Sequence, residues 1–151
     1  MPTPCSKDFA IHVAELVCPS EDITWSVGTF PGNGTATANA SGMSGSADLA
    51  STPGDPGVAQ QVATFSTNNF CSLADQTLRI TVTWTISGAS PVGFPFVFTI
   101  DGNDYFPPGP PQGDGSTFVD VAMVFGDNTL TISCELDGGG HATLNFSCAF
   151  I

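Results

Sequence analysis

Residues 78–86 read LRITVTWTI, and this stretch decides the fold. Its large apolar side chains stand at every second position, with arginine and threonine between them. A period of two is the signature of a strand with one buried and one solvated face. The same alternation returns near the end of the chain, in TLTISCEL (residues 129–136) and ATLNFSCAF (residues 142–150). The sequence therefore predicts sheets that bury one face against each other.

Further short strands are predicted on both sides of this stretch, separated by turns rich in Gly, Pro, Asn and Asp. They cover residues 23–27, 58–67, 94–100 and 118–125. Residues 6–18 fit a helix or a strand, and we expect a strand because the rest of the chain is β. We therefore expect residues 1–151 to form one all-β domain. Its architecture is an antiparallel β-sandwich, immunoglobulin-like or jelly-roll-like, with about eight strands.

Residues 28–57 differ in composition from the rest of the chain. Gly, Ala, Ser, Thr and Pro dominate them, and large apolar residues are scarce. Alone, such a segment cannot offset the entropy lost on ordering. We expect a flexible long loop or an extended arm that lies on a neighbouring subunit, and the sequence leaves both open.

Five cysteines cannot all pair within one chain, and the spacing leaves the pairing of Cys5, Cys18, Cys71, Cys134 and Cys148 open. If the last two strands form a hairpin through residues 137–140, Cys148 lies roughly 13 Å from Cys134 along the strands. A disulfide needs the two Cα atoms within about 7 Å. We therefore predict that these two cysteines do not bond to each other.

The spacing of Cys71, Trp84 and Cys134 resembles the cysteine–tryptophan–cysteine pattern of immunoglobulin domains. The resemblance covers these three residues, and Ile132 stands where that family has its tyrosine-corner residue. It implies an immunoglobulin-like sandwich with a Cys71–Cys134 bridge.

The charge balance excludes several classes of partner. The net charge is −12, and Lys7 and Arg79 are the only strong bases. Phosphate contacts need Lys and Arg, so we expect no nucleic-acid partner. The same argument predicts no binding to an anionic membrane surface. Residues 1–7 also lack the basic start and apolar core of a signal peptide, so we expect synthesis in a host cytoplasm without secretion.

The sequence contains no recognisable catalytic constellation. The histidines are His12 and His141, and residues 42–46 (GMSGS) lack the final glycine of a nucleophile elbow. We expect no enzymatic activity, no catalytic residue and no cofactor. Asp101, Asn103 and Asp104 are weak calcium candidates because oxygen donors alternate along one loop. A plain hairpin turn at Asp101-Gly102 is the favoured interpretation, with no metal.

The leading functional hypothesis is a structural or assembly protein of a virion, such as a capsid decoration, cement or fibre subunit. Its partners would be copies of itself or a major structural protein. In this hypothesis residues 107–115 project as a stiff loop, and Phe150-Ile151 complete a sheet edge in the same or an adjacent subunit. The residues expected to contact neighbouring subunits are Phe30, Pro31, Met43, Leu49, Tyr105, Phe106, Phe150 and Ile151.

The alternative hypothesis is an extracellular or cell-surface adhesin or carbohydrate-binding module. Trp25, Tyr105 and Phe106 lie outside the core pattern and are candidates to stack on sugars. The competing interpretation of these aromatic side chains is that they cover the rim of the core.

Overall fold

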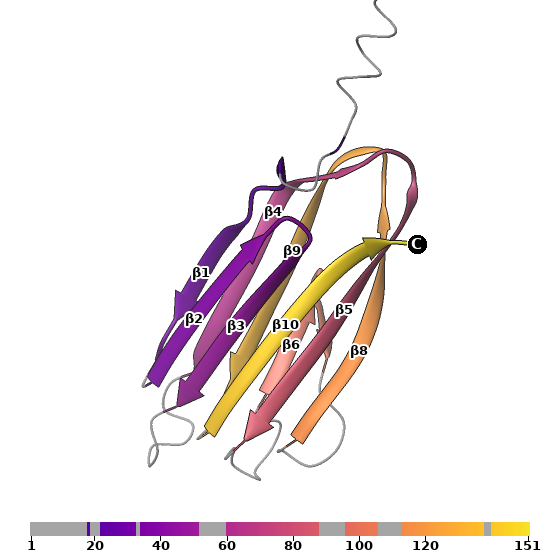
Figure 1. Ribbon diagram of the computed structural model, residues 1–151. Coiled ribbons are helices and arrows are strands. Elements are labelled where there is room, and N and C mark those ends of the chain that lie inside the picture. The colour runs from indigo at the N-terminus through magenta and orange to yellow at the C-terminus, as the bar shows by residue number, and fades with distance from the viewer. Residues whose placement is uncertain are drawn as a thin grey trace, which may run out of the picture.

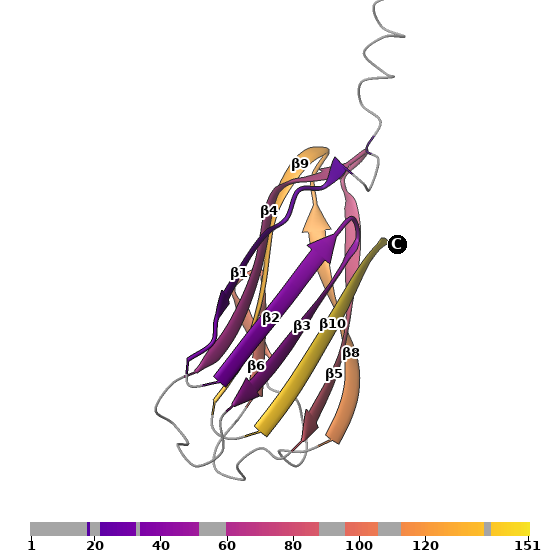
Figure 2. The same cartoon turned by 60° about the vertical axis from the view of Figure 1, so that its left-hand side comes forward.

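The computed structural model describes residues 18, 22–32, 34–51, 60–87, 96–105, 113–137 and 140–151. Within them, ten strands form two antiparallel sheets that face each other (Figures 1 and 2). The strands are β1 (Ser26–Phe30), β2 (Gly34–Ser41), β3 (Ser44–Ser51), β4 (Gln61–Ser72), β5 (Gln76–Ser87), β6 (Phe96–Ile100), β7 (Asn103–Tyr105), β8 (Gly113–Met123), β9 (Gly126–Leu136) and β10 (Gly140–Phe150). No helix of the described residues is long and apolar enough to span a membrane.

Each sheet has five strands. The order is β1-β4-β9-β6-β7 in one, called the β4 sheet below, and β2-β3-β10-β5-β8 in the other, called the β10 sheet. Their facing sides enclose one core of aromatic and aliphatic side chains, among them Phe65, Phe98, Leu144 and Phe146. The expected all-β antiparallel sandwich is therefore confirmed, and the expectation that residues 1–151 form one domain stays a prediction.

Period-two alternation accounts for the central strands. In β5, Leu78, Ile80 and Val82 are fully buried, whereas Arg79 and Thr81 between them are half-buried. Strand β5 lies between β10 and β8, with Val82 opposite Phe146 of β10. Burying one face of each strand against the other sheet supplies the main stabilising term.

The last two long strands do not pair with each other. Strand β9 lies between β4 and β6, whereas β10 lies between β3 and β5 in the other sheet. The expected β9–β10 hairpin is wrong, because the same alternation suits a chain that crosses between sheets. The prediction drawn from it is nevertheless confirmed, since Cys134 and Cys148 are both buried free cysteines.

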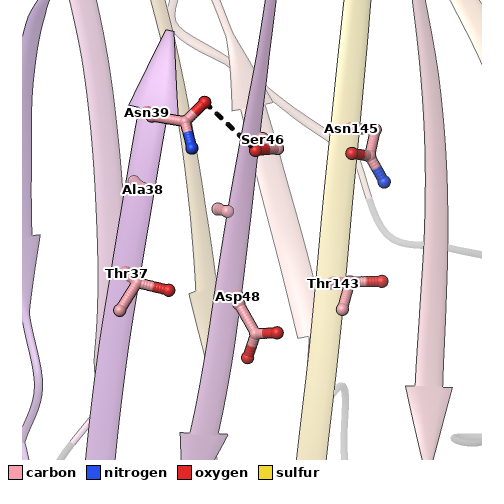
Figure 3. Close-up of a pocket in the computed structure, with 8 residues that line it drawn as sticks. Thr37, Ala38, Asn39, Ser46, Asp48, Thr143 and Asn145 are labelled. Atoms are coloured by element: carbon pink, nitrogen blue, oxygen red, sulfur yellow. Dashed lines mark hydrogen bonds between the residues drawn. The ribbon is translucent and has the colours of Figure 1, made fainter.

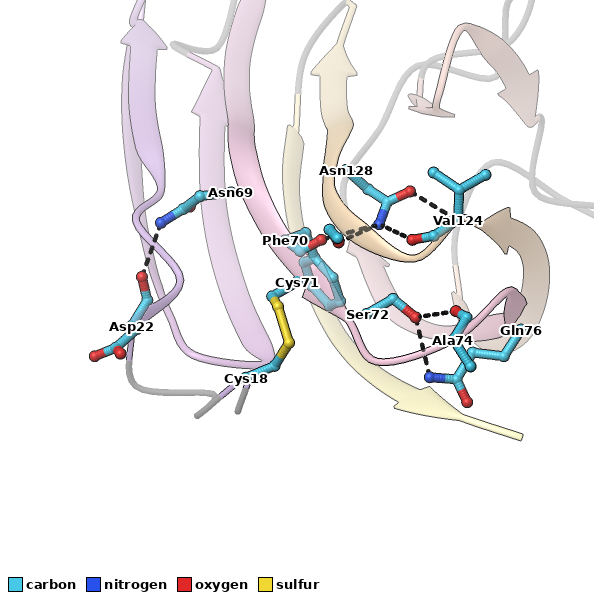
Figure 4. Close-up of a disulfide and its surroundings, with 11 residues drawn as sticks. Cys18, Asp22, Asn69, Phe70, Cys71, Ser72, Ala74, Gln76, Val124 and Asn128 are labelled. Carbon is cyan, nitrogen blue, oxygen red and sulfur yellow. Dashed lines mark hydrogen bonds between the residues drawn. A yellow bond between two sulfur atoms is a disulfide. The ribbon is translucent and has the colours of Figure 1, made fainter. Parts of the chain in front are cut away.

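A disulfide joins Cys18 to Cys71 at one end of the sandwich, with a Cα–Cα distance of 5.5 Å (Figure 4). The Cys71–Cys134 bridge implied by the immunoglobulin resemblance is wrong. Cys134 faces Ala63 on the neighbouring strand β4, and Cys71 lies about 26 Å further along that strand, at roughly 3.3 Å a residue. The two cysteines belong to one sheet, whereas an immunoglobulin bridge joins two.

The segment expected to be a flexible loop or arm is, in its described part, built into the sandwich. Residues 26–51 form β1, β2 and β3, and β3 pairs with β10. Small side chains are required there, because a Cβ atom on Gly45 would collide with the ring of Phe146. Gly42 makes the β2–β3 turn with a φ of 57°. The ordering entropy is offset by pairing with a distant strand, which local composition does not reveal; residues 52–59 lie outside the described part.

The C-terminal residues pair with β5. Phe150 pairs with Leu78 of β5, and the backbone N–H of Ile151 donates to the carbonyl of Thr77. Strand β10 pairs with both β3 and β5 only as far as Ser147, so the expectation that Phe150-Ile151 complete a sheet edge in the same or an adjacent subunit stays a prediction. Among the described strands, β2 and β8 form the edges of this sheet.

Candidate functional site: a polar sheet face

The outward side of the β10 sheet carries polar side chains on three adjacent strands. The alternation that turns Ala38, Leu49 and Phe146 inward turns the polar residues beside them outward. These residues are Thr37 and Asn39 of β2, Ser46 and Asp48 of β3, and Thr143 and Asn145 of β10 (Figure 3). They line a hollow of about 270 Å³, and we call the whole outward side of the β10 sheet, which contains this hollow, the polar face.

Strand register places the polar side chains in rows that run across the strands. In the first row, Thr37 is opposite Asp48, and Asp48 is opposite Thr143. The row continues with Thr85 of β5 and ends at Asp114 of β8. The second row is formed in the same way by Asn39, Ser46, Asn145, Thr83 and Ser116. Each row therefore offers a hydrogen-bonding group on every strand it crosses.

Some of these groups already have partners. The Ser46 hydroxyl donates to Oδ1 of Asn39 at 3.4 Å, and Nε2 of His141 lies 2.7 Å from Oδ1 of Asp48. The hydroxyls of Thr85 and Thr143 hydrogen-bond across the β5–β10 pair. In Figure 3 no hydrogen bond joins the amide of Asn145 to the other residues that line the hollow, so its donors and acceptor are available to a ligand there.

A cation, a carboxylate and an aromatic ring meet at the β8 edge of this face. Arg79 donates from Nε and Nη2 to the two oxygens of Asp120, at 2.8 and 2.9 Å. Its guanidinium carbon lies 3.9 Å from the centre of the Phe118 ring, which is 54% exposed. The hydrogen bonds from Arg79 lower the pKa of Asp120, and those to Asp120 raise the pKa of Arg79. The pair is thus ionised and mutually neutralised at ordinary pH.

The aromatic residues expected to stack on sugars pack against the core where the structure describes them. Trp25 contacts the rings of Phe70 and Phe146, and its indole N–H donates to the carbonyl of Gly42 at 2.9 Å. Tyr105 stacks on Phe98, with ring centres 5.4 Å apart. These contacts match the rim interpretation. Phe106 lies outside the described residues.

The calcium candidates lie in a tight turn between β6 and β7. Asp101 and Gly102 both have positive φ, 51° and 84°, as a two-residue hairpin turn requires. The Asp104 carboxylate accepts a hydrogen bond from Thr99 at 2.8 Å. In the part of the chain that the structure describes, no three His, Cys, Asp or Glu residues gather as metal ligands.

Of the eight residues expected to contact neighbouring subunits, Phe106 lies outside the described residues and the other seven fall into three groups. Phe30, Pro31 and Ile151 are exposed. Met43 and Phe150, like Tyr105, are partly buried and pack on the core, and Leu49 is a core residue that is not accessible to a neighbour. They belong to different strands and turns, and the structure does not gather them into one surface.

Two features of the surface were not predicted from the sequence. The polar face depends on the pairing of β2 with β3 and of β3 with β10, which the sequence does not disclose. The other is a set of exposed apolar side chains at the disulfide end: Leu73, Val124 and Phe125. The strand expected over residues 118–125 ends at Met123, and Phe125 lies in the following turn.

No protein-family model matches the chain, and no curated protein matches it. Solved structures do match in fold. The enzymatically active domain of tailspike protein 4 from bacteriophage CBA120 aligns with 84% of this chain and 19% of its own, at 13% identity and a TM-score of 0.50. This chain therefore spans about a fifth of that structure, and the likeness shows the fold alone.

Two carbohydrate-binding modules also align over most of their own length. The CBM22-1 xylan-binding domain from Paenibacillus barcinonensis Xyn10C aligns with 90% of this chain and 94% of its own, at 13% identity and a TM-score of 0.44. TmCBM61, solved in complex with β-1,4-galactotriose, aligns with 84% of this chain and 88% of its own, at 9% identity and a TM-score of 0.42.

Proposed function

We propose that the protein is a non-enzymatic carbohydrate-binding domain whose ligand lies on the polar face. The observation that carries the proposal is the hollow, whose six outward side chains end in a hydroxyl, an amide or a carboxylate. Sugar hydroxyls both donate and accept hydrogen bonds, and this set of side chains does the same. Small-ligand sites are concave, and the polar groups in them fix the orientation of the ligand.

The scaffold suits this task, because the hollow is built on strands. Adjacent strands hold the side chains in register, so little conformational freedom is lost when a ligand binds. The contacts of Ser46 with Asn39 and of His141 with Asp48 orient the groups further.

We place the protein outside the cell or on a virion, and the Cys18–Cys71 disulfide supports this location. Disulfides persist in oxidising surroundings and are rare in the cytosol. The expectation of cytoplasmic synthesis is compatible with it only if the bridge forms after release from the host.

The test is a glycan array followed by titration of the strongest ligand with Asn145→Ala. Loss of the amide is expected to weaken binding by about two- to tenfold, since a hydrogen bond contributes about 0.5–1.5 kcal/mol and about 1.4 kcal/mol corresponds to a factor of ten. Thr131→Ala is the matched control, because Thr131 is exposed on β9 in the other sheet. Absence of glycan binding, or equal losses in both variants, would contradict the proposal.

A second candidate function is a structural subunit of a virion. The exposed apolar side chains Leu73, Val124 and Phe125 favour it, because large apolar groups gathered at one end mark contact surfaces. The turns that carry them are held in place, since the Phe125 N–H donates to Asp75 and the Asn128 amide donates to the carbonyl of Phe70 (Figure 4). Density-gradient sedimentation of native material tests this function. Co-migration with large particles at fixed stoichiometry supports it, and a slow monomeric band rejects it.

A further inference from the structure

We infer that the polar face selects neutral glycans and holds one as an extended chain that runs across the strands, with Phe118 as an aromatic platform at its β8 end. The inference rests on the proposed function and specifies its ligand class.

Selection against acidic glycans follows from the cations available. Lys7 and Arg79 are the only strong bases of the chain, and Lys7 lies outside the described residues. Arg79 is held by both oxygens of Asp120, and His141 lies against Asp48. Among the described residues, a uronate or sulfate on this face would therefore meet carboxylates and no cation that is not already paired with a carboxylate. Like-charge contact of this kind discriminates between ligands, and the net charge of −12 adds repulsion at longer range.

The direction of the ligand follows from the two rows. Neighbouring strands lie about 4.8 Å apart, which is close to the length of one pyranose unit in an extended chain. The first row runs from Thr37 to Asp114 and the second from Asn39 to Ser116, each across five strands. Four strand spacings make roughly 19 Å, so the face accommodates about four sugar units.

The aromatic platform stands beside the end of the second row. Phe118 is two residues from Ser116 on β8, so both side chains point outward. Arg79 packs on its ring while Asp120 fixes the guanidinium, which restrains the ring before a ligand arrives. An exposed ring of this kind can pack against the C–H face of a neutral sugar.

Affinity gel electrophoresis on paired polymers tests the charge selection. Hydroxyethyl cellulose and carboxymethyl cellulose of equal substitution differ in charge, and arabinoxylan, galactan, polygalacturonate and alginate extend the series. We expect at least tenfold stronger retardation by the neutral polymers at low ionic strength. Acidic polymers that retard the protein as strongly would overturn the inference and leave carbohydrate binding intact. Retardation by no polymer would reject the proposed function, and the inference with it.

Charge variants make the test independent of the natural ligand. Asp120→Asn frees Arg79, so binding of polygalacturonate is expected to rise at least several-fold. Asp127→Asn makes the same change in net charge at an exposed position on β9 and is expected to leave it unchanged. If the binding of polygalacturonate rose equally in both variants, net charge alone would account for the selection and the Arg79–Asp120 pair would have no part in it, which contradicts the inference.

A length series tests the track and its platform. Calorimetry with neutral oligosaccharides of two to six units, from whichever polymer binds, should show affinity rising to about four units and then levelling off. Phe118→Ala should weaken the longer ligands at least fivefold. Phe30→Ala is the matched control, because Phe30 is 58% exposed on the opposite sheet. Affinity independent of length, or equal loss in both variants, contradicts the placement.

Discussion

Removing the Cys18–Cys71 disulfide is expected to cost about 4 kcal/mol in the free energy of unfolding. The bridge links residues 53 positions apart. Loop-closure entropy for that separation is about 14 cal/mol/K, or about 4 kcal/mol at 25 °C, in the chain-entropy model. The bridge also fixes Cys18 at the end of β4, a strand that is distant from it in the sequence.

The assay compares the double variant Cys18→Ser/Cys71→Ser with the protein that keeps both cysteines. Both proteins also carry Cys5→Ser, so that Cys5, which lies outside the described residues, cannot form another disulfide. Thermal unfolding followed by tryptophan fluorescence is expected to show a fall in Tm of about 8–16 °C, since 1 kcal/mol shifts a domain of this size by about 2–4 °C. Reducing agent should lower the Tm of the parent by the same amount and leave the double variant unchanged.

A fall of less than about 3 °C would refute this reasoning, because the bridge would then constrain little of the unfolded chain. Peptide mapping without reduction tests whether a small fall in Tm arises because the cysteines are paired differently. A peptide that links Cys18 to Cys71 is expected, and one that links Cys71 to Cys134 would show that the pairing itself is wrong.

Three further predictions concern packing and titration. Gly115→Ala should destabilise the fold by about 1–3 kcal/mol in urea denaturation, because the added Cβ would collide with the Trp84 indole, and an unchanged midpoint would contradict this contact. Glu135 is half-buried between Val62 and Val97, and burial raises the pKa of its carboxyl group. The stability that the protonated carboxyl contributes below its pKa in the unfolded chain is therefore lost as the pH rises through its pKa in the folded protein. Glu135→Gln should therefore raise the stability by less than about 1 kcal/mol at pH 7 and leave it unchanged at pH 3, and a loss at pH 7 would reverse the sign. Burial raises the pKa of the Cys134 and Cys148 thiols to about 12, so in Cys5→Ser they should react with Ellman's reagent only after unfolding; rapid reaction at pH 8 in the native state would contradict their burial.

The faces of the long strands could be predicted from the sequence. Ile80 and Val82 in β5, and Leu130 and Ile132 in β9, are buried as the alternation indicates. This succeeds because side-chain direction in a strand is a local property with a period of two.

The strands β2 and β3 could not be predicted, for a reason visible at Gly45 and Phe146. Large side chains are scarce in residues 34–51, and at Gly45 the reason is that the ring of Phe146 already fills the space where a side chain would lie. A small residue that faces a large one on another strand looks, in the sequence alone, like a residue of a flexible loop. The reason for the small residue is Phe146, about a hundred positions away, and the composition of a short sequence segment around Gly45 does not include it.

One part of the candidate site could be predicted from the sequence, and the other depends on strand pairing that the sequence does not show. The outward threonines of β5 were evident from the alternation, and their chemistry was as well. The hollow, however, needs Asn39, Ser46 and Asn145 side by side, and their strands are neighbours only through the β2–β3 and β3–β10 pairings.

The difference between position along the chain and pairing between strands also explains why the predicted Cys71–Cys134 bridge is wrong. The spacing of Cys71, Trp84 and Cys134 constrains positions along the chain, but a bridge depends on which sheet each strand joins. Placing β4 and β9 side by side puts Cys134 against Ala63 and leaves Cys71 at the far end of the strand, within reach of Cys18. A period of two assigns each side chain to the inside or the outside and says nothing about its neighbour across the ladder. Binding on a sheet depends on those neighbours, so the polarity of this face follows from the sequence and its shape follows only from the fold.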